Sequence, residues 1–321
     1  MRAIRVHQPG GPDVLTAEDV PLPVPAAGQA LIKVAAAGVN FIDTYFRTGL
    51  YQAPLPLTLG QEGAGTVERV GPGVTEVAPG DRVAFTGVPG CYAEHVVAPA
   101  ARLVALPDAL GFDDGAALML QGMTAHYLAT TTFRLAPGHA CLVHAAAGGV
   151  GLLLVQIAKR KGARVIGTAG SEAKAALARE AGADHVIKYR SEDVVGEVRR
   201  LTDGRGVDVV YDGVGKATFD ASLACVAPWG LLAMFGNASG AVPPFDLLRL
   251  QDNARFLARP RLGEHIASRS DLLWRAGELM EWAAAGQLTL RIHRRYALAD
   301  AAVAHRDLES RATSGKLLLI P

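Results

Sequence analysis

The sequence predicts an α/β fold in which a doubly wound parallel sheet is inserted into a second, mostly β domain. Three observations support this prediction. At 321 residues the chain is long enough for two domains. Its early part consists of short strands between turns, and its middle part alternates apolar strands with amphipathic helices, before a last apolar segment that needs a sheet to join. We expect residues 1–121 with 265–321 to form one domain, and residues 122–264 the other.

Clusters of glycine and proline mark the turns of the mostly β domain. Pro21–Pro25, Gly71–Gly73 and Pro79–Asp81 punctuate short strands such as Leu31–Val34 and Arg82–Phe85. Glycine allows positive φ and proline fixes negative φ, so such clusters are typical of turns between strands. The early part of the chain therefore predicts a β domain.

The inserted domain is expected to consist of βαβ units, because short apolar strands joined by helices form a parallel sheet with right-handed crossovers. The predicted strands are Ala140–His144, Arg164–Thr168, His185–Tyr189, Val207–Tyr211 and Gly230–Phe235, and the predicted helices are Val150–Lys161, Ser171–Ala181 and Asp193–Leu201. Beyond this domain we expect a helix over Asp271–Ala285 and a final strand over Gly315–Ile320, for which the mostly β domain is the expected host.

Composition and charge exclude several classes of protein. Half of the residues are hydrophobic, and 32 Lys and Arg against 31 Asp and Glu leave a net charge of +1, whereas a generic binder of polyanions carries a clear basic excess. The cysteines, Cys91, Cys141 and Cys225, are far apart and predict neither a disulfide framework nor a zinc site. No apolar segment approaches the ~20 residues of a membrane span, so we expect a cytoplasmic protein without a membrane partner.

A glycine-rich segment after the first strand of the inserted domain indicates a dinucleotide site. Ala146–Gly151 is an A-x-G-x-x-G variant of the dinucleotide fingerprint, with Ala146 in place of the first glycine. Gly148 would let the backbone approach a pyrophosphate, and Gly151 would let the helix pack closely. An isolated segment of this kind could be a packing turn, but the βαβ context favours a cofactor. The residues expected to bind it are Ala147, Gly148, Gly149 and Val150.

The end of the second strand predicts which dinucleotide is bound. An NAD-binding domain carries an acidic residue there for the ribose hydroxyls, whereas this chain has Thr168-Ala169-Gly170. Lys174 lies in the first turn of the next helix, where it opposes the helix dipole unless an anion such as a 2′-phosphate compensates. These cations could also be solvated surface charges, but the missing acid favours NADPH over NADH. The residues expected here are Gly170, Ser171, Lys174, Tyr189 and Arg190.

Further segments carry a family resemblance that runs nearly end to end. They are Val39–Asp43, Thr48–Tyr51, Gly60–Gly65, Val70–Val74, Pro79–Val83, His144–Gly151, Phe235–Gly240 and Leu308–Gly315. In these segments the chain resembles the zinc-free NADPH:quinone oxidoreductases of the medium-chain dehydrogenase/reductase superfamily. The resemblance implies a Rossmann domain that binds NADPH, inserted into a GroES-like substrate domain. It also implies a homodimer, joined through strands near Leu231–Gly236.

Two positions distinguish the chain from the zinc-dependent members of that superfamily. The alcohol dehydrogenases hold zinc with a cysteine, the histidine of a Gly-His-Glu segment and a later cysteine. Here Gln61 stands in the histidine's place, and Asn40 lies where the first cysteine belongs. Glutamine is a poor zinc ligand, so we expect no bound metal. Without a Lewis acid the oxidation of simple alcohols is unfavourable, whereas quinones and enones delocalise the charge that develops on reduction.

By the same resemblance, Asn40, Tyr45 and Tyr51 lie where the family places its nicotinamide and acceptor. An amide or phenol there could donate a hydrogen bond to the oxyanion that forms after hydride transfer. Tyr51 could also supply a proton, but a phenol with a pKa of ~10 is a reluctant acid, so we expect it to line the pocket. The tyrosines could instead simply pack. The resemblance also places Thr124, Phe235, Gly236 and Asn237 against the cofactor and Arg311 near its adenosine phosphate.

Three functions remain open, and an NADPH:quinone oxidoreductase that works by hydride transfer without zinc is the leading hypothesis. An alkenal or enoyl reductase would transfer the same hydride to carbon of a conjugated carbonyl. An NADPH-bound RNA-binding protein is the third, because residues 249–295 hold nine arginines and five acidic residues. A solvated face is the simpler explanation of that charge, so we do not expect RNA to be the main partner.

Overall fold

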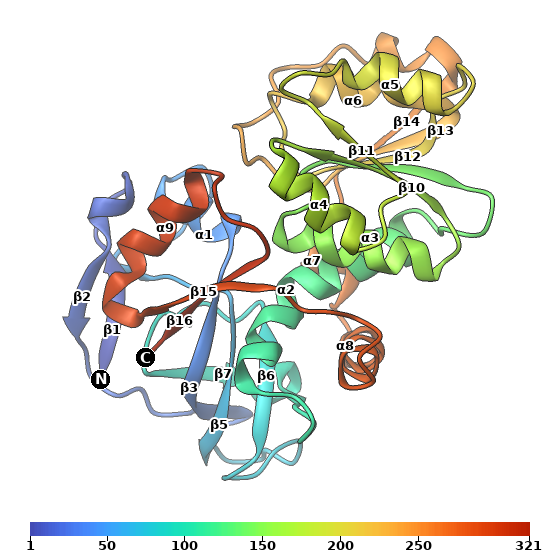
Figure 1. Cartoon of the computed structure of the whole chain (residues 1–321). Coiled ribbons are helices and arrows are strands. Elements are labelled where there is room, and N and C mark those ends of the chain that lie inside the picture. Colours follow the sequence, from blue (N-terminus) through green and yellow to red (C-terminus); the bar gives the residue numbers. More distant parts are fainter. The chain divides into compact units, whose positions relative to one another are not determined.

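The chain divides into two compact units (Figure 1), and the computed structural model describes residues 1–321. One unit holds Met1–Met123 and Ile266–Pro321, and the other holds Thr124–His265. The second unit is therefore an insertion between two segments of the first.

The first unit is built on two sheets. A three-stranded antiparallel sheet has the order β2-β1-β4, and a seven-stranded mixed sheet has the order β15-β16-β3-β5-β6-β8, with β7 paired to β3. The strands are β1 (Arg2–Val6), β2 (Thr16–Asp19), β3 (Gln29–Val39), β4 (Leu57–Thr58), β5 (Glu62–Val70), β6 (Arg82–Thr86), β7 (His95–Pro99), β8 (Val104–Ala105), β15 (Ile292–Ala297) and β16 (Lys316–Ile320).

The final strand, β16, lies inside the larger sheet. It is parallel to β15 on one side and antiparallel to β3 on the other, where Leu317 faces Val39 and Leu319 faces Ala37. This confirms the prediction that the mostly β domain hosts the last strand. The chain must therefore return from the inserted unit before this sheet is complete.

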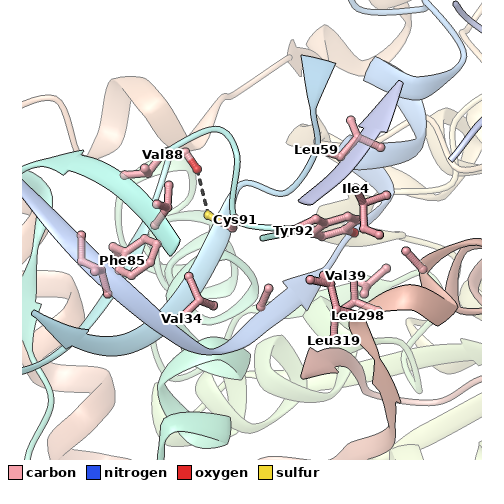
Figure 2. Close-up of a cluster of buried hydrophobic side chains, with 14 of the residues drawn as sticks. Ile4, Val34, Val39, Leu59, Phe85, Val88, Cys91, Tyr92, Leu298 and Leu319 are labelled. Atoms are coloured by element: carbon pink, nitrogen blue, oxygen red, sulfur yellow. Dashed lines mark hydrogen bonds between the residues drawn. The ribbon is translucent and has the colours of Figure 1, made fainter. Parts of the chain in front are cut away.

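The core of the first unit joins these strands to the segment after the insertion. Val34, Phe85 and Tyr92 from the early strands and loops pack in one cluster with Leu298 and Leu319 (Figure 2). Burying apolar side chains of this size contributes roughly 1.5–3 kcal/mol each. Residues from both ends of the chain thus share one core.

The helices of the first unit were predicted only in part. They are α1 (Phe41–Arg47), α2 (Phe112–Tyr127), whose last residues belong to the second unit, α8 (Arg269–Ala284) and α9 (Ala301–Glu309). The predicted helix over Asp271–Ala285 begins two residues earlier than expected, because Ser268 caps it by accepting from the Asp271 N–H. None of the chain's helices combines the length and the apolar character that crossing a membrane requires.

The second unit is a six-stranded parallel sheet in the order β11-β10-β9-β12-β13-β14. Its strands are β9 (Ala140–Val143), β10 (Arg164–Ala169), β11 (His185–Lys188), β12 (Val207–Asp212), β13 (Val226–Met234) and β14 (Phe256–Ala258), and its helices are α3 (Gly149–Arg160), α4 (Glu172–Glu180), α5 (Val194–Leu201), α6 (Phe219–Cys225) and α7 (Leu262–His265). The strand order reverses between β9 and β12. Because crossovers between parallel strands are right-handed as a rule, this reversal puts helices on both faces of the sheet, as predicted for a doubly wound fold.

Caps explain where the helices α4 and α5 begin relative to the prediction. Ser171 and Asp193 lie outside α4 and α5 as N-caps, and their side chains accept hydrogen bonds from first-turn amides. β13 begins at Val226 instead of Gly230. The three-residue β14 and the seven-residue α6 were not predicted, since periodicity is hard to detect in segments this short.

Candidate active site

The predicted phosphate loop lies at the carboxyl ends of the central strands of the second unit. It connects β9, which ends at Val143, to α3, which begins at Gly149. The His144 N–H donates to the β12 carbonyl of Tyr211 (3.1 Å), and the Ala146 N–H donates to the β10 carbonyl of Thr168 (3.0 Å). The loop is thus tied to both neighbouring strands where the strand order reverses, which is where doubly wound sheets bind ligands.

Two glycines of this loop serve different purposes. Gly148 is the N-cap of α3 and offers no side chain, so the first-turn amides of the helix are left uncapped for an anion. A Cβ on Gly151 would overlap the carbonyl oxygen of Ala145, so glycine lets α3 begin close against the turn. Ala147 is buried, whereas Gly148, Gly149 and Val150 are partly exposed. The loop therefore has the form that a pyrophosphate site requires.

A basic pair lies beside the end of β10. Lys174 is in the first turn of α4, where its N–H donates to Ser171 Oγ (3.4 Å). Burial, and then the nearby charge of Arg190, lower the pKa of the Lys174 ammonium. Tyr189 Oη would lie 2.6 Å from a Cβ on Gly170, so the hydroxyl end of the tyrosine packs against the Gly170 backbone, where a side chain would not fit. All five predicted residues gather here, and two neighbouring cations favour an anion between them.

The loop after β13 rests on the loop after β12. The ring of Phe235 packs on Gly213, where a Cβ would lie 2.8 Å from ring carbons, and a Cβ on Gly236 would overlap the carbonyl of Gly213. In the orientation of the Asn237 amide that pairs both of its groups, the nitrogen donates to Gly236 O and the oxygen accepts from Arg259 Nη2, each at 3.0 Å. These contacts hold Phe235, Gly236 and Asn237 in one defined segment at the same edge of the sheet.

In the first unit, Asn40 is buried at the N-terminus of α1, and its side-chain amide makes all the hydrogen bonds that it can make. Its amide nitrogen donates to Glu62 Oε2 (2.9 Å) and Gly38 O (3.2 Å). Its amide oxygen accepts from Gln121 Nε2 (3.1 Å) and Lys316 Nζ (2.9 Å). An amide has two donor hydrogens and two acceptor lone pairs, so this capacity is filled. The predicted donation to a substrate oxyanion would require one of these bonds to break.

Asn40 belongs to a cluster around a buried ion pair between Glu62 and Lys316. The two side chains are 0% and 2% exposed, and the Lys316 ammonium contacts Glu62 Oε2 directly. The other carboxylate oxygen accepts from the main-chain N–H of Leu120 in α2. An uncompensated buried charge costs several kcal/mol, so this pairing is obligatory once the fold has formed. The cluster joins β5, β16, α1 and α2.

A second carboxyl, Asp43, lies next to this cluster and is wholly buried. Its Oδ2 accepts from the Asn40 N–H and from Tyr92 Oη, each at 2.9 Å, whereas Oδ1 has no partner. Burial raises the pKa of Asp43 to about 7. Tyr92 Oη lies 3.2 Å from His305 Nε2, and burial followed by the charge of Arg47 lowers the pKa of His305 to about 3. At neutral pH the imidazole is therefore uncharged, and Asp43 is close to its midpoint.

The predicted tyrosines form an aromatic cluster with Phe46. Tyr51 meets Tyr45 and Phe46 edge to face, with ring centroids 5.3 and 5.7 Å apart. Tyr45 is buried and Tyr51 is partly exposed. Of the remaining predicted residues, Thr124 is buried in α2, and Arg311 follows α9 with a positive φ of 58°. Asn40, both tyrosines and Arg311 thus belong to the first unit, and the other predicted residues to the second.

Sequence reasoning missed two members of the buried cluster, Glu62 and Lys316, and the adjacent Asp43. Glu62 lies in the Gly-Gln-Glu segment used for the resemblance, Asp43 follows Asn40 by three residues, and Lys316 opens an otherwise apolar strand. A single charged residue within an apolar strand is the available signal, because such a residue is rarely buried unless it is paired. The partner that satisfies each charge could not be identified from neighbours in the sequence.

The positions at which zinc dehydrogenases carry their ligands do not form a zinc site in this chain. Gln61 is an amide, and Glu62 is already bound by the Lys316 ammonium. Cys91 is buried elsewhere, with its thiol donating to the carbonyl of Val88. No group of three or more His, Cys, Asp or Glu side chains comes together in a way that could hold a metal ion. The donor set does not fit Zn²⁺, which prefers thiolate, imidazole and carboxylate ligands.

Comparison with protein families accounts for both units. The family model described as "Alcohol dehydrogenase GroES-like domain" matches residues 26–108, within the first unit. The model described as "Zinc-binding dehydrogenase" matches residues 149–264, within the second. The chain thus has the two-part organisation of these dehydrogenases, although it lacks the zinc ligands that the second description implies.

Individual relatives match along almost the whole chain. A quinone oxidoreductase of Pseudomonas aeruginosa is 47% identical and covers 97% of each chain. A 2-haloacrylate reductase of a Burkholderia species is 40% identical over 98% of each chain. The crystal structure of Escherichia coli quinone oxidoreductase complexed with NADPH is 42% identical, covers 100% of both chains and superposes with a TM-score of 0.98.

Replacing Asp43 with asparagine is expected to flatten the pH dependence of folding stability. Between its ordinary pKa of 3.8 and its folded value of about 7, the folded state holds a proton that the unfolded state releases. The wild-type protein should therefore lose stability as pH rises through this window, by at most about 1.4 kcal/mol per pH unit from this group. The amide introduced by Asp43→Asn cannot ionise, yet it keeps an oxygen for the Asn40 and Tyr92 bonds.

The test is chemical denaturation from about pH 4 to pH 8, with the exposed Asp252→Asn as control. The difference in unfolding free energy between the Asp43 variant and the wild type should shift in the variant's favour as pH rises. Asp252→Asn should follow the wild type. Parallel profiles for all three proteins would contradict the assignment.

Proposed function

Because the chain belongs to the quinone oxidoreductase family of the medium-chain dehydrogenase/reductase superfamily, we propose that it reduces quinones by zinc-independent hydride transfer from NADPH. That it is an NADPH-dependent oxidoreductase follows from the family. One observation supports the zinc independence and the acceptor class: Asn40, at a zinc-ligand position, is fully bonded within a closed cluster with Glu62 and Lys316.

The second unit supplies the proposed NADPH site. The uncapped first turn of α3, after Gly148, would bind the pyrophosphate. Lys174 and Arg190 would bind the 2′-phosphate, whose charge relieves their mutual repulsion. When bound, NADPH supplies the hydride. We place Phe235, Gly236 and Asn237 along the cofactor, as the family resemblance implies.

The cluster in the first unit limits which acceptors can react. The positive charge of Lys316 is neutralised by Glu62 and buried, so it cannot polarise a carbonyl as zinc does. The amide hydrogens of Asn40 are already donated within the protein. With so little electrophilic help available, the acceptor must disperse its own developing charge. A quinone does so over its ring, whereas a simple ketone cannot.

Conjugated alkenes are a second candidate class of acceptor. The Burkholderia relative at 40% identity is named a 2-haloacrylate reductase, and a double bond conjugated to an electron-withdrawing group also delocalises charge after hydride addition. We therefore keep alkenals and enones as the alternative to quinones.

The function is tested by NADPH oxidation against a panel of quinones, alkenals, enones and simple ketones, with and without a chelator. We expect turnover with quinones, none with simple ketones and no effect of the chelator. Turnover confined to the conjugated alkenes would select the second candidate. Loss of activity on chelation, together with about one zinc per chain, would overturn the zinc-independent mechanism.

Lys174→Ala should weaken NADPH binding by about 1.5–3 kcal/mol, the range for a lost hydrogen bond to a charged group. NADH lacks the 2′-phosphate, so its affinity should barely change. Lys188, whose ammonium lies 3.2 Å from Glu172, provides the matched control, and its replacement by Ala should leave both affinities unchanged. Titration of each cofactor by fluorescence measures the effect. An equal loss for both cofactors in Lys174→Ala would make Lys174 structural.

Tyr51→Phe should reduce kcat with a good quinone by less than about tenfold at saturating NADPH. The variant keeps the ring contacts with Tyr45 and Phe46, and a hydroquinone anion can take its proton from water. Asn40→Ala should cost more, because it removes contacts to the buried Glu62 and Lys316. A thousandfold loss in Tyr51→Phe would instead identify the phenol as the proton donor.

We further propose that two copies of the chain associate through the β14 edge of the second unit. Trp229, Leu247, Leu248 and Phe256 expose large apolar side chains here, Trp229 by 73%. Apolar exposure beside an outer strand is typical of an interface. The sequence favoured contact near Leu231–Gly236, but β13 is hydrogen-bonded to a strand on each side. Only β14 offers a free edge on this side of the sheet.

Light scattering after size-exclusion chromatography should give twice the mass of one chain. Phe256→Asp should shift the protein toward the monomer, because it introduces a charge at the edge without disturbing the buried sheet. Leu273→Asp, at an exposed position of α8 in the first unit, is the control and should leave the mass unchanged. A wild-type protein that runs as a monomer would contradict the proposal.

RNA has no role in the proposed function. Several arginines of the segment 249–295 are engaged within the protein: Arg255 and Arg259 donate to the carbonyls of Val226 and Met234. Arg249 forms an ion pair with Asp220. Three of the nine arginines in this segment are thus engaged within the fold.

A further inference from the structure

A chain of buried polar side chains crosses the carboxyl ends of β9, β10 and β12 in the second unit. His144 follows β9, and its Nδ1 lies 3.1 Å from Thr168 Oγ1 in β10. Its Nε2 lies 3.0 Å from Ser222 Oγ in α6, which is 2.6 Å from Asp212 Oδ2 at the end of β12. All four side chains are at least 96% buried. The described function uses none of them.

The bonding partners determine which group donates and which accepts in each hydrogen bond of this series of side chains. Ser222 has a single hydroxyl hydrogen, which it donates to the Asp212 carboxylate at 2.6 Å, so toward His144 it can only accept. His144 therefore carries its proton on Nε2, and its bare Nδ1 accepts from the Thr168 hydroxyl. Thr168 Oγ1 in turn accepts from the Ala145 N–H at 3.3 Å. Burial lowers the pKa of His144, which keeps the imidazole neutral, as this arrangement needs.

The two ends of this hydrogen-bond chain, Thr168 and Asp212, hold the two loops that face the proposed cofactor. At one end, Ala145 opens the turn that carries the phosphate loop, and the Gly148 N–H donates to its carbonyl (2.8 Å). At the other end, Asp212 Oδ1 accepts from the N–H groups of Val214 (2.7 Å) and Gly215 (3.1 Å). The loop so fixed supports the segment after β13, since the Ser239 N–H donates to the Val214 carbonyl (2.7 Å).

We propose that this hydrogen-bond chain sets the spacing between the phosphate loop and the loop after β12, and that His144 and Ser222 are positioning residues for NADPH. Neither residue needs to touch the cofactor. Apolar side chains of similar volume could fill this part of the core at little cost in stability, but they would not fix one loop to the other. The proposal rests on the proposed use of NADPH.

Asp212 also provides a matched control. Thr218 Oγ1 donates to the same oxygen, Asp212 Oδ2, at the same 2.6 Å as Ser222, but Thr218 has no bond to His144. Ser222→Ala and Thr218→Val therefore each remove one hydroxyl from one carboxylate oxygen, and only Ser222→Ala breaks the side-chain connection to the phosphate loop, whose main-chain bonds remain. Thr218 also contacts the Gly215 carbonyl (3.2 Å), so its variant reports any loosening of that loop alone.

The experiment measures NADPH affinity of the full-length wild type, of both variants, of Thr168→Val and of the double variant Ser222→Ala/Thr168→Val. If the hydrogen-bond chain acts as a whole, Ser222→Ala lowers the affinity for NADPH about fivefold to tenfold, and Thr218→Val lowers it less than about twofold. Thr168→Val should match Ser222→Ala, and the double variant should lose little more than either, because one cut already interrupts the side-chain connection between the loops.

The fragment 2′,5′-ADP separates positioning from general damage to the fold. It occupies only the adenosine side of the proposed site, so its affinity should change less than about twofold in Ser222→Ala. Equal losses of NADPH affinity in Ser222→Ala and Thr218→Val, additive losses in the double variant, or equal losses for NADPH and 2′,5′-ADP would each overturn the inference. If the wild type binds no NADPH, the proposed function fails instead.

Discussion

The buried ion pair between Glu62 and Lys316 is the interaction on which the arrangement of the first unit depends. Neither charge can remain in this core alone, because removing an ion from water costs several kcal/mol. The pair therefore links the last strand to β5 across the intervening β3, and both charges also bind Asn40 at the start of α1. The segment that carries Tyr45 and Tyr51 begins within α1. Its position is thus set by a residue close to the other end of the sequence.

The same pair has a chemical consequence. Glu62 follows Gln61 in the sequence, and both charges bond Asn40, so the pair adjoins the two residues that stand at zinc-ligand positions by resemblance; it leaves no net charge to offer a substrate. An enzyme of this kind reacts best with acceptors that stabilise an anion themselves, which is the chemistry that quinones and activated alkenes share. The fold is that of a dehydrogenase, and in the proposed function the electrostatics of the cluster favour such acceptors.

The second unit uses buried polar bonds in a similar way. Around Asp212, hydroxyl and amide hydrogens converge on one carboxylate at the end of a central strand, and His144 extends the set to the phosphate loop. In both units the polar groups are satisfied by partners from several elements. A well-packed apolar core tolerates small shifts of neighbouring elements, whereas a saturated hydrogen-bond network allows one arrangement. Each unit can thus present its site residues in a fixed geometry.

The amino-acid sequence by itself determined the two-part organisation, the parallel sheet with its phosphate loop, the missing acid after β10 and the loss of the zinc ligands at Asn40 and Gln61. The two-part organisation follows from the order of segments along the chain, and the others are local signals, each contained in a few consecutive residues. Only the tertiary structure showed that Asn40 bonds Lys316 across 276 residues and that His144 bonds Ser222 across 78. Such pairs depend on the register of strands that are distant in sequence. Which charge or hydroxyl meets which partner is therefore decided only when the sheets have formed.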